Sequence, residues 1–176
     1  MEDTPPPNSA PPTQSVASSK NPPSSSKMPS SFRGINHLKL PATDILKTSS
    51  FYTTIFPFTR LPHYDHFTPD HKLFAVMFAH APTNLIVEIR HVPDQVVSAQ
   101  RGWDPITWGV DTRADLEEWG TWFDANGVRR SRVLRGIKGW VLCCEDPDGR
   151  VVRVYCEEEH EWTDFPDRDE FWLGRY

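Results

Sequence analysis

The chain has 176 residues and carries 19 basic against 24 acidic side chains, a formal net charge of −5. This length favours one domain, and the acidic balance argues against a nucleic-acid-binding protein. The longest apolar run, 73–79, is far shorter than the ~20 residues of a membrane-spanning helix. Neither a secretory nor a mitochondrial signal is visible, and three cysteines form no disulfide framework. These features predict a cytoplasmic protein.

The two ends of the chain differ in composition from its middle. Residues 1–31 hold eight of the 17 prolines and nine serines, without any aromatic, Leu or Ile side chain. Such a segment cannot bury enough apolar surface to offset its ordering entropy, so we expect it to be disordered. We expect one folded domain over 32–160. The extension 161–176 is rich in aromatic side chains and is expected to pack on the domain or on a second copy.

The first half of the folded part, 34–91, predicts one helix and four strands. Residues 34–40 alternate in polarity, which is typical of a strand. Asp44 is the expected N-cap of a helix of about three turns. The further strands are expected at 58–61, 72–79 and 84–91.

The same order of elements returns in 105–156. A strand is expected at 106–110, and the following helix should begin with a capping box of Thr112 and Asp115. Asn126 and Gly127 should end that helix. The remaining strands are expected at 128–134, 140–145 and 151–156, with a turn at 146–149. The repeated β-α-β-β-β order indicates an internal duplication and an α+β fold.

Strand alternation gives each predicted sheet an apolar, helix-facing side and an opposite polar side. The polar sides collect His37, Lys39, Glu88, Arg90, Thr107, Arg153 and Tyr155. If the face is open to water, these are ordinary solvated side chains. If the two half-sheets curl together, they line a cavity with excess positive charge, which favours an anionic or electron-rich ligand. A register slip of one residue would invert this assignment.

Five motifs follow one another along the chain at 35–38, 44–52, 85–89, 106–111 and 146–149. They read Ile-Asn-His-Leu, Asp followed by Ser-Phe-Tyr, Leu-Ile-Val-Glu-Ile, Ile-Thr-Trp-Gly-Val-Asp and Asp-Pro-Asp-Gly. This series resembles the vicinal oxygen chelate superfamily, the group of glyoxalases, bleomycin-resistance proteins and extradiol dioxygenases. The resemblance implies a glyoxalase-like fold, with two βαβββ modules forming curled half-barrel sheets around a shared cavity. The cavity would lie within one chain or across a homodimer.

The resemblance also implies a divalent metal, with ligands from the first and last strand of each module. These positions fall on His37 and Glu88 in the first module, and on Pro105 and Arg153 in the second. Proline has no ligating side chain, and a guanidinium repels a cation. Because structural sites usually take four protein ligands and catalytic sites three, we expect no tightly bound metal. A metal held by His37 and Glu88 alone remains the alternative.

The function favoured by these residues is a glyoxalase-like enzyme with lyase or isomerase-type proton transfer on an anionic or phenolic, oxygen-rich metabolite. Arg153 would hold an oxyanion, His37 would move a proton, and Glu88 would orient His37 or act as the base. The expected substrate-binding residues are Lys39, Arg90, Thr107 and Tyr155.

Three alternatives remain open at this stage. The chain could be a non-catalytic small-molecule binding or resistance protein of the bleomycin-resistance type. It could be a metal-dependent dioxygenase or lyase. Glu88 and Arg153 could also form a buried ion pair that fills an inactive site.

Overall fold

The structure is a computed structural model that describes residues 34–161. The expected N-terminal tail, 1–31, and nearly all of the aromatic extension, 161–176, lie outside the described residues. Helices within the described part are too short and too polar to span a bilayer.

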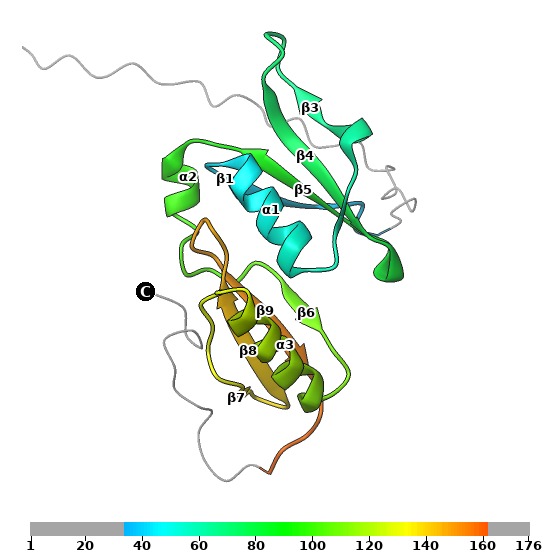
Figure 1. Cartoon of the computed structure of the whole chain (residues 1–176), viewed down its shortest axis with the longest axis vertical. Helices are drawn as coiled ribbons and strands as arrows, with labels where there is room; N and C mark the ends of the chain where they lie inside the picture. Colours follow the sequence, from blue (N-terminus) through cyan, green and yellow to red (C-terminus); the bar gives the residue numbers. More distant parts are fainter. Residues whose placement is uncertain (1–33, 162–176) are drawn as a thin grey trace, which may run out of the picture. The chain divides into compact units, whose positions relative to one another are not determined.

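The first module is a helix packed on a mixed sheet (Figure 1). Its elements are β1 (Leu38–Ala42), α1 (Ile45–Ile55), β2 (Thr59–Arg60), β3 (His66–Phe67), β4 (Leu73–His80) and β5 (Leu85–His91), with 3-10 turns at Pro62–Tyr64 and Ala81–Thr83. The strand order is β1-β5-β4-β2, and β3 pairs with β4. Strand β1 runs parallel to β5. Asp44 caps α1 as predicted, because its side chain accepts a hydrogen bond from the backbone N of Lys47.

The second module repeats this topology without a counterpart of β3. After the short helix α2 (Asp94–Ser98) come β6 (Thr107–Gly109), α3 (Arg113–Ala125), β7 (Leu134–Arg135), β8 (Trp140–Glu145) and β9 (Val151–Cys156). The strand order is β6-β9-β8-β7, and the first strand again runs parallel to the last. The capping box of Thr112 and Asp115 is present, and Gly127 has the predicted left-handed backbone, with φ 65°. The predicted α+β fold with two βαβββ modules is confirmed.

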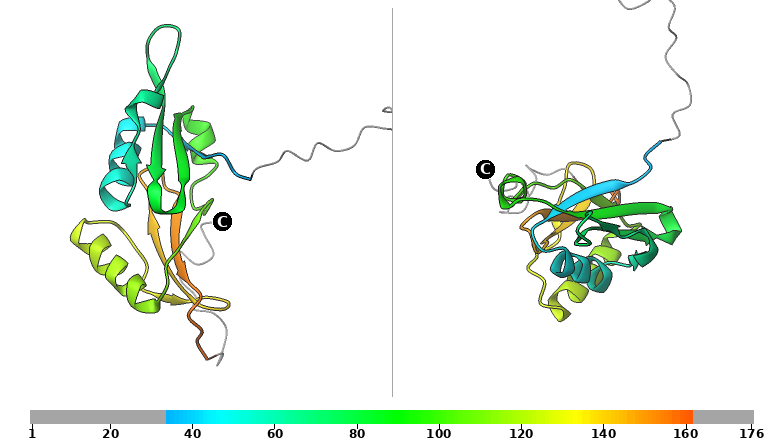
Figure 2. Two further views of the ribbon diagram at one scale, coloured as in Figure 1. Left: turned by 90° about the vertical axis from the view of Figure 1, so that its right-hand side faces the viewer. Right: turned by 90° about the horizontal axis from the view of Figure 1, so that it is seen from above.

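Helices α1 and α3 lie on the same side of the two sheets (Figure 2). Apolar side chains from both modules form one core cluster, which includes Ile89 of β5 and Phe123 of α3. At the junction of the modules, the ring of Phe56 stacks on that of Trp119, with 5.5 Å between their centroids. The indole Nε1–H of Trp122 donates a hydrogen bond to the carbonyl of Ile55 at 2.9 Å.

The turn between β8 and β9 carries buried charge against the first module. Asp148 is only 5 % exposed. Its carboxylate accepts hydrogen bonds from the backbone N of Thr43 at 3.1 Å and from the Thr48 hydroxyl at 2.7 Å. Both donors belong to the chain segment where α1 begins. The second module therefore supplies a carboxylate that satisfies polar groups at the start of the helix in the first.

Arg150 completes this buried network. Its guanidinium, which is fully buried, donates to Asp146 at 2.9 Å and to Asp148 at 3.2 Å. It also donates to the carbonyl of Pro41 in β1. Burial raises the pKa of Asp146 above its usual value, while the neighbouring guanidinium acts in the opposite direction. The two modules are thus joined by buried charged side chains, each of which has the opposite charge of another as its partner.

One predicted strand is wrong, and two elements were not predicted. The first strand also begins later than predicted, at Leu38, so His37 precedes it. Residues 128–133 contact β8 through an isolated bridge between Arg130 and Cys144 and two backbone hydrogen bonds, and the strand β7 begins at Leu134. The side chain of Arg130 in this segment turns back to α3, where it binds Asp124 at 2.5 Å. Strand β3 and helix α2 have two and five residues, too few to produce a periodic pattern.

The buried network predicts a large loss of stability for Arg150→Met. Asp146 and Asp148 would remain buried without their guanidinium, which should lower the free energy of unfolding by about 3–5 kcal/mol. Urea denaturation measures this loss.

The matched control is Arg129→Met, which removes a partly exposed ion pair with Glu145 at 2.6 Å. This control should cost less than about 1 kcal/mol. Similar losses in the two variants would contradict the role given to Arg150.

Candidate functional site

The face of the first sheet opposite α1 carries a cluster of charged side chains around Glu88. The Nη2 atom of Arg90 lies 2.6 Å from Glu88 Oε1. Lys39 Nζ and His37 Nε2 each lie 3.3 Å from Glu88 Oε2. We call these four residues, His37, Lys39, Glu88 and Arg90, the Glu88 cluster. The structure brings together four of the seven side chains that the sequence predicts for the site.

Strand register explains why these side chains meet. In the ladder, Lys39 of β1 lies beside Glu88 of β5, and Glu88 lies beside Met77 of β4. The next residues, Leu40 and Ile89, are buried in the core cluster under α1. Because successive side chains of a strand point to opposite faces, the buried apolar residues place the charged ones on the other face.

Glu88 is buried, whereas the cations around it reach solvent. The Glu88 side chain is 1 % exposed, and those of Lys39 and Arg90 are 50 % and 36 % exposed. Burial alone would raise the pKa of Glu88, but hydrogen bonds from Arg90 and Lys39 outweigh it and hold the pKa below the usual range. Glu88 is therefore an ionised carboxylate at neutral pH, with cations on its solvent side.

His37 has two different nitrogen environments. Its Nδ1 lies 2.8 Å from the side-chain oxygen of Asn36. Its Nε2 is buried, 3.3 Å from Glu88 Oε2, without a well-formed hydrogen bond. Glu88 therefore lies beside any proton that Nε2 carries, and the contacts of the two nitrogens fix the orientation of the ring.

The second sheet has the same register with different side chains. Thr107 of β6 lies beside Arg153 of β9, and Arg153 lies beside Cys143 of β8. Arg153 therefore occupies the place in its module that Glu88 occupies in the first. Pro105, two residues before Thr107, corresponds in the same way to His37, two residues before Lys39. The second module therefore has a guanidinium where the first has a buried carboxylate.

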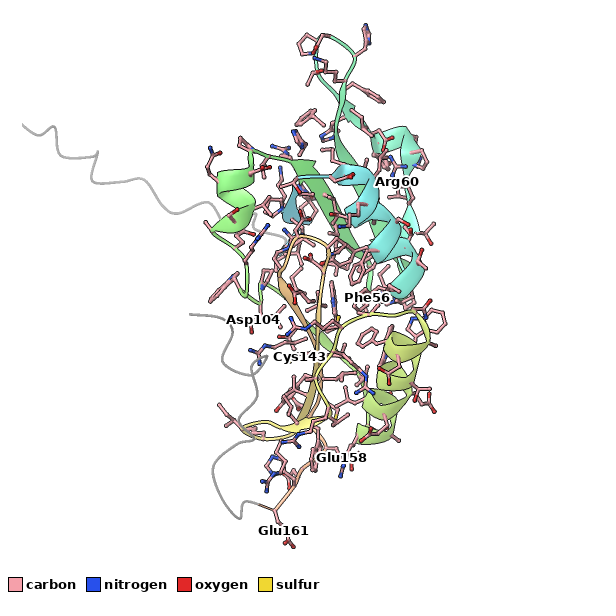
Figure 3. The ribbon with its side chains drawn as sticks, turned by 60° about the vertical axis from the view of Figure 1, so that its left-hand side comes forward. Phe56, Arg60, Asp104, Cys143, Glu158 and Glu161 are labelled. Atoms are coloured by element: carbon pink, nitrogen blue, oxygen red, sulfur yellow. The ribbon has the colours of Figure 1, made fainter. Side chains whose placement is uncertain are left out.

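Arg153 has a counterion in its own module. Its Nε lies 2.5 Å from the Oδ2 atom of Asp104. Asp104, labelled in Figure 3, lies in the segment that leads into β6. Asp104 was not predicted as a site residue. Its position in the sequence could have indicated it, because Asp104 immediately precedes Pro105, the counterpart of His37.

Tyr155 is also engaged within the second module. Its ring packs on a small apolar cluster that contains Val141 and Cys143, and its hydroxyl accepts a hydrogen bond from the backbone N of Gly139 at 2.9 Å. Thr107, in contrast, is exposed. The three predicted residues of the second sheet therefore have different surroundings: Arg153 binds Asp104, Tyr155 binds Gly139, and Thr107 is exposed. That they line one cavity together with the Glu88 cluster stays a prediction.

The side chains at the implied metal position do not fit a divalent cation. Both carboxylate oxygens of Glu88 already face cationic groups, and the equivalent position holds Arg153. Within 34–161, no group of three or more His, Cys, Asp and Glu side chains is placed to hold a metal. Catalytic zinc sites usually have three protein ligands, so these residues do not provide a metal centre of that kind.

Comparisons with known proteins agree with the topology. The family model of the Glyoxalase/Bleomycin resistance protein/Dioxygenase superfamily matches residues 34–154. A glyoxylase/bleomycin resistance protein/dioxygenase domain from Frankia sp. EAN1pec is 17% identical, with a TM-score of 0.56 over 73% of this chain and 100% of that chain. No match was found among curated proteins.

Two further solved structures are similar in fold. The fosfomycin resistance protein FosX from Listeria monocytogenes is 19% identical, with a TM-score of 0.57 over 71% of this chain and 93% of that chain. Lactoylglutathione lyase from Agrobacterium tumefaciens is 19% identical, with a TM-score of 0.52 over 73% of this chain and 95% of that chain. At these identities the structures show a shared fold. Together with the family match over most of the chain, the repeated βαβββ topology shows that this protein belongs to the glyoxalase/bleomycin resistance protein/dioxygenase superfamily.

Proposed function

We propose that the chain is a glyoxalase-like enzyme that binds a small anionic or phenolic, oxygen-rich molecule at the Glu88 cluster and moves a proton through His37. The proposed chemistry is of the lyase or isomerase type. One observation carries the proposal: a buried, ionised carboxylate lies 3.3 Å from a histidine nitrogen and is bordered by two partly exposed cations.

The charge of the cluster supports an anionic ligand. Lys39 and Arg90 contribute two positive charges against the single negative charge of Glu88. Both cations are partly exposed, and each has more N–H donors than its contacts with Glu88 require. A carboxylate, phenolate or enolate oxygen could therefore bind to them without displacing Glu88.

His37 is the proposed base, and Glu88 the residue that positions it. A carboxylate whose pKa is held low is a weak base at neutral pH, so Glu88 is poorly suited to remove a proton itself. An imidazole has an unperturbed pKa near ~6.5 and exchanges protons readily in this range. Glu88 beside Nε2 would stabilise the imidazolium that forms, and Lys39 and Arg90 would stabilise the negative charge that remains on the substrate.

The second module has a lesser part in this proposal. Arg153 is held by Asp104, and Tyr155 by the backbone of Gly139. With Thr107, they would contact a ligand only if it extends to the second sheet, within one chain or across a homodimer. We therefore propose His37 and Glu88 as the proton-transfer pair and Lys39 and Arg90 as the anion contacts.

The first prediction from this proposal concerns the removal of His37. Wild-type protein is screened by thermal shift with fosfomycin, S-lactoylglutathione and phenylpyruvate, and proton transfer is followed by 1H NMR as exchange of ligand C–H for deuterium in D2O. His37→Gln should reduce that exchange at least ~100-fold, because general-base catalysis contributes roughly 10²–10⁴-fold. Ligand affinity should change little, since the anion contacts remain.

His63→Gln is the matched control, because His63 is exposed in the Pro62–Tyr64 turn. This variant should exchange protons at the wild-type rate. If His37→Gln retains the wild-type rate, the histidine is not the base. If wild-type protein binds a ligand but leaves it unchanged throughout, the non-catalytic binding alternative holds instead.

The second prediction concerns pH and stability. The pKa of Glu88 is lower in the folded chain than in the unfolded one. Its ionised form therefore stabilises the fold at any pH above the pKa of the unfolded chain. This contribution is lost as the pH falls through the pKa of the folded chain. Glu88→Gln should cost about 1–3 kcal/mol at pH 7. The difference from wild type should shrink steadily below about pH 4.5.

Urea unfolding at several pH values measures this difference, with the exposed Glu159→Gln as the control. The control should follow the wild-type curve throughout. If the difference in the free energy of unfolding between Glu88→Gln and wild type does not change with pH, the negative charge of the carboxylate does not stabilise the fold.

A further inference from the structure

A groove on the helical side of the molecule has a chemistry opposite to that of the Glu88 cluster. It has a volume of about 800 Å³ and lies where the end of α1 meets α3 and the segment after β6. Figure 3 labels Phe56 at this junction. The volume falls in the range of small-molecule binding sites, roughly 300–1,000 Å³. The proton-transfer proposal makes no use of this groove.

Aromatic rings line the groove and are fixed in position. Phe56 and Trp119 both line it, and their rings stack 5.5 Å apart, inclined by 28°. Trp122 lines it too, is 44 % exposed, and is anchored by its hydrogen bond to the carbonyl of Ile55. An exposed, anchored indole offers a ring face to a ligand with little loss of side-chain freedom.

The charge of the groove is negative. Three carboxylates line it, those of Asp111, Asp115 and Glu118, and no Lys, Arg or His is among the described residues that do. Hydrogen bonds from Thr112 hold the pKa of Asp115 below its usual value, so this carboxylate is charged at neutral pH. Helix α1 also ends in the groove, and the C-terminal end of a helix favours positive charge.

Arginines of α3 and the segment after it are engaged elsewhere. The guanidinium of Arg113 lies over the ring of Trp140, 3.9 Å from its centroid. Arg130 is bound by Asp124. These contacts hold both guanidinium groups in other interactions, so the groove keeps its negative charge.

We infer that this groove binds a small organic cation, an alkylated ammonium whose charged head lies against the face of Trp122. A cation over an indole is attracted by the negative face of the ring, and the carboxylates of Asp111 and Glu118 supply the opposite charge. A neutral molecule of the same shape would have the apolar contact but neither electrostatic attraction. An anion would be repelled.

The test compares choline with its uncharged analogue of the same shape, 3,3-dimethylbutan-1-ol. The readout is the indole N–H resonance of Trp122 in 1H–15N spectra of the full chain, identified by its absence in Trp122→Phe. Choline should shift this resonance in a saturable manner, and the analogue should bind at least ~fivefold more weakly. No shift with choline, or equal affinity for both compounds, would overturn the inference.

Two neighbouring glutamates of α3 provide a matched pair of variants. Glu118 lines the groove, whereas Glu117 is exposed outside its lining and lies 3.7 Å from Arg113. Glu118→Gln should weaken choline binding about two- to fivefold, Asp111→Asn should do the same, and Glu117→Gln should leave it unchanged. If Glu117→Gln weakens binding as much as Glu118→Gln, the effect is general surface charge and the groove is not the site.

Discussion

Three charged side chains buried between the modules are the constraint on which the arrangement of this protein depends. Asp146, Asp148 and Arg150 lie in and after a tight turn of the second module, yet their partners include the backbone of Pro41 and Thr43 in the first. A buried charge without a partner is very costly. The turn therefore favours the position in which all three are satisfied, and in the same arrangement the end of α1 lies next to α3, with the groove between them.

The Glu88 cluster follows the same principle with a different result. A buried carboxylate needs cations, and here the chain supplies them from its own side chains, Lys39 and Arg90. At the equivalent place in the second module, Arg153 finds Asp104. The two modules thus keep one backbone plan while the charge at the matching position is reversed. Because the second module has a cation at a position where the resemblance implies a metal ligand, we propose chemistry that uses side chains alone.

The sequence predicted those features that depend on local periodicity. The alternation of β1 and β5 assigned Lys39 and Glu88 to one face, and the spacing of Thr112 and Asp115 identified the start of α3. It could not predict pairings between distant segments. Asp104 lies in an irregular segment, where only its place before Pro105 marks it, and Arg150 after a turn looks like an ordinary solvated residue. The groove between α1 and α3 exists only once the modules are packed.

The central claim is that Lys39, Arg90 and His37 hold the Glu88 carboxylate in place of a divalent metal. Elemental analysis tests it most directly, on protein purified without chelators from medium supplemented with manganese, iron, nickel and zinc. The account predicts only substoichiometric metal, at the same level in wild type and in Glu88→Gln. A stoichiometric metal in wild type that is lost in Glu88→Gln would contradict it.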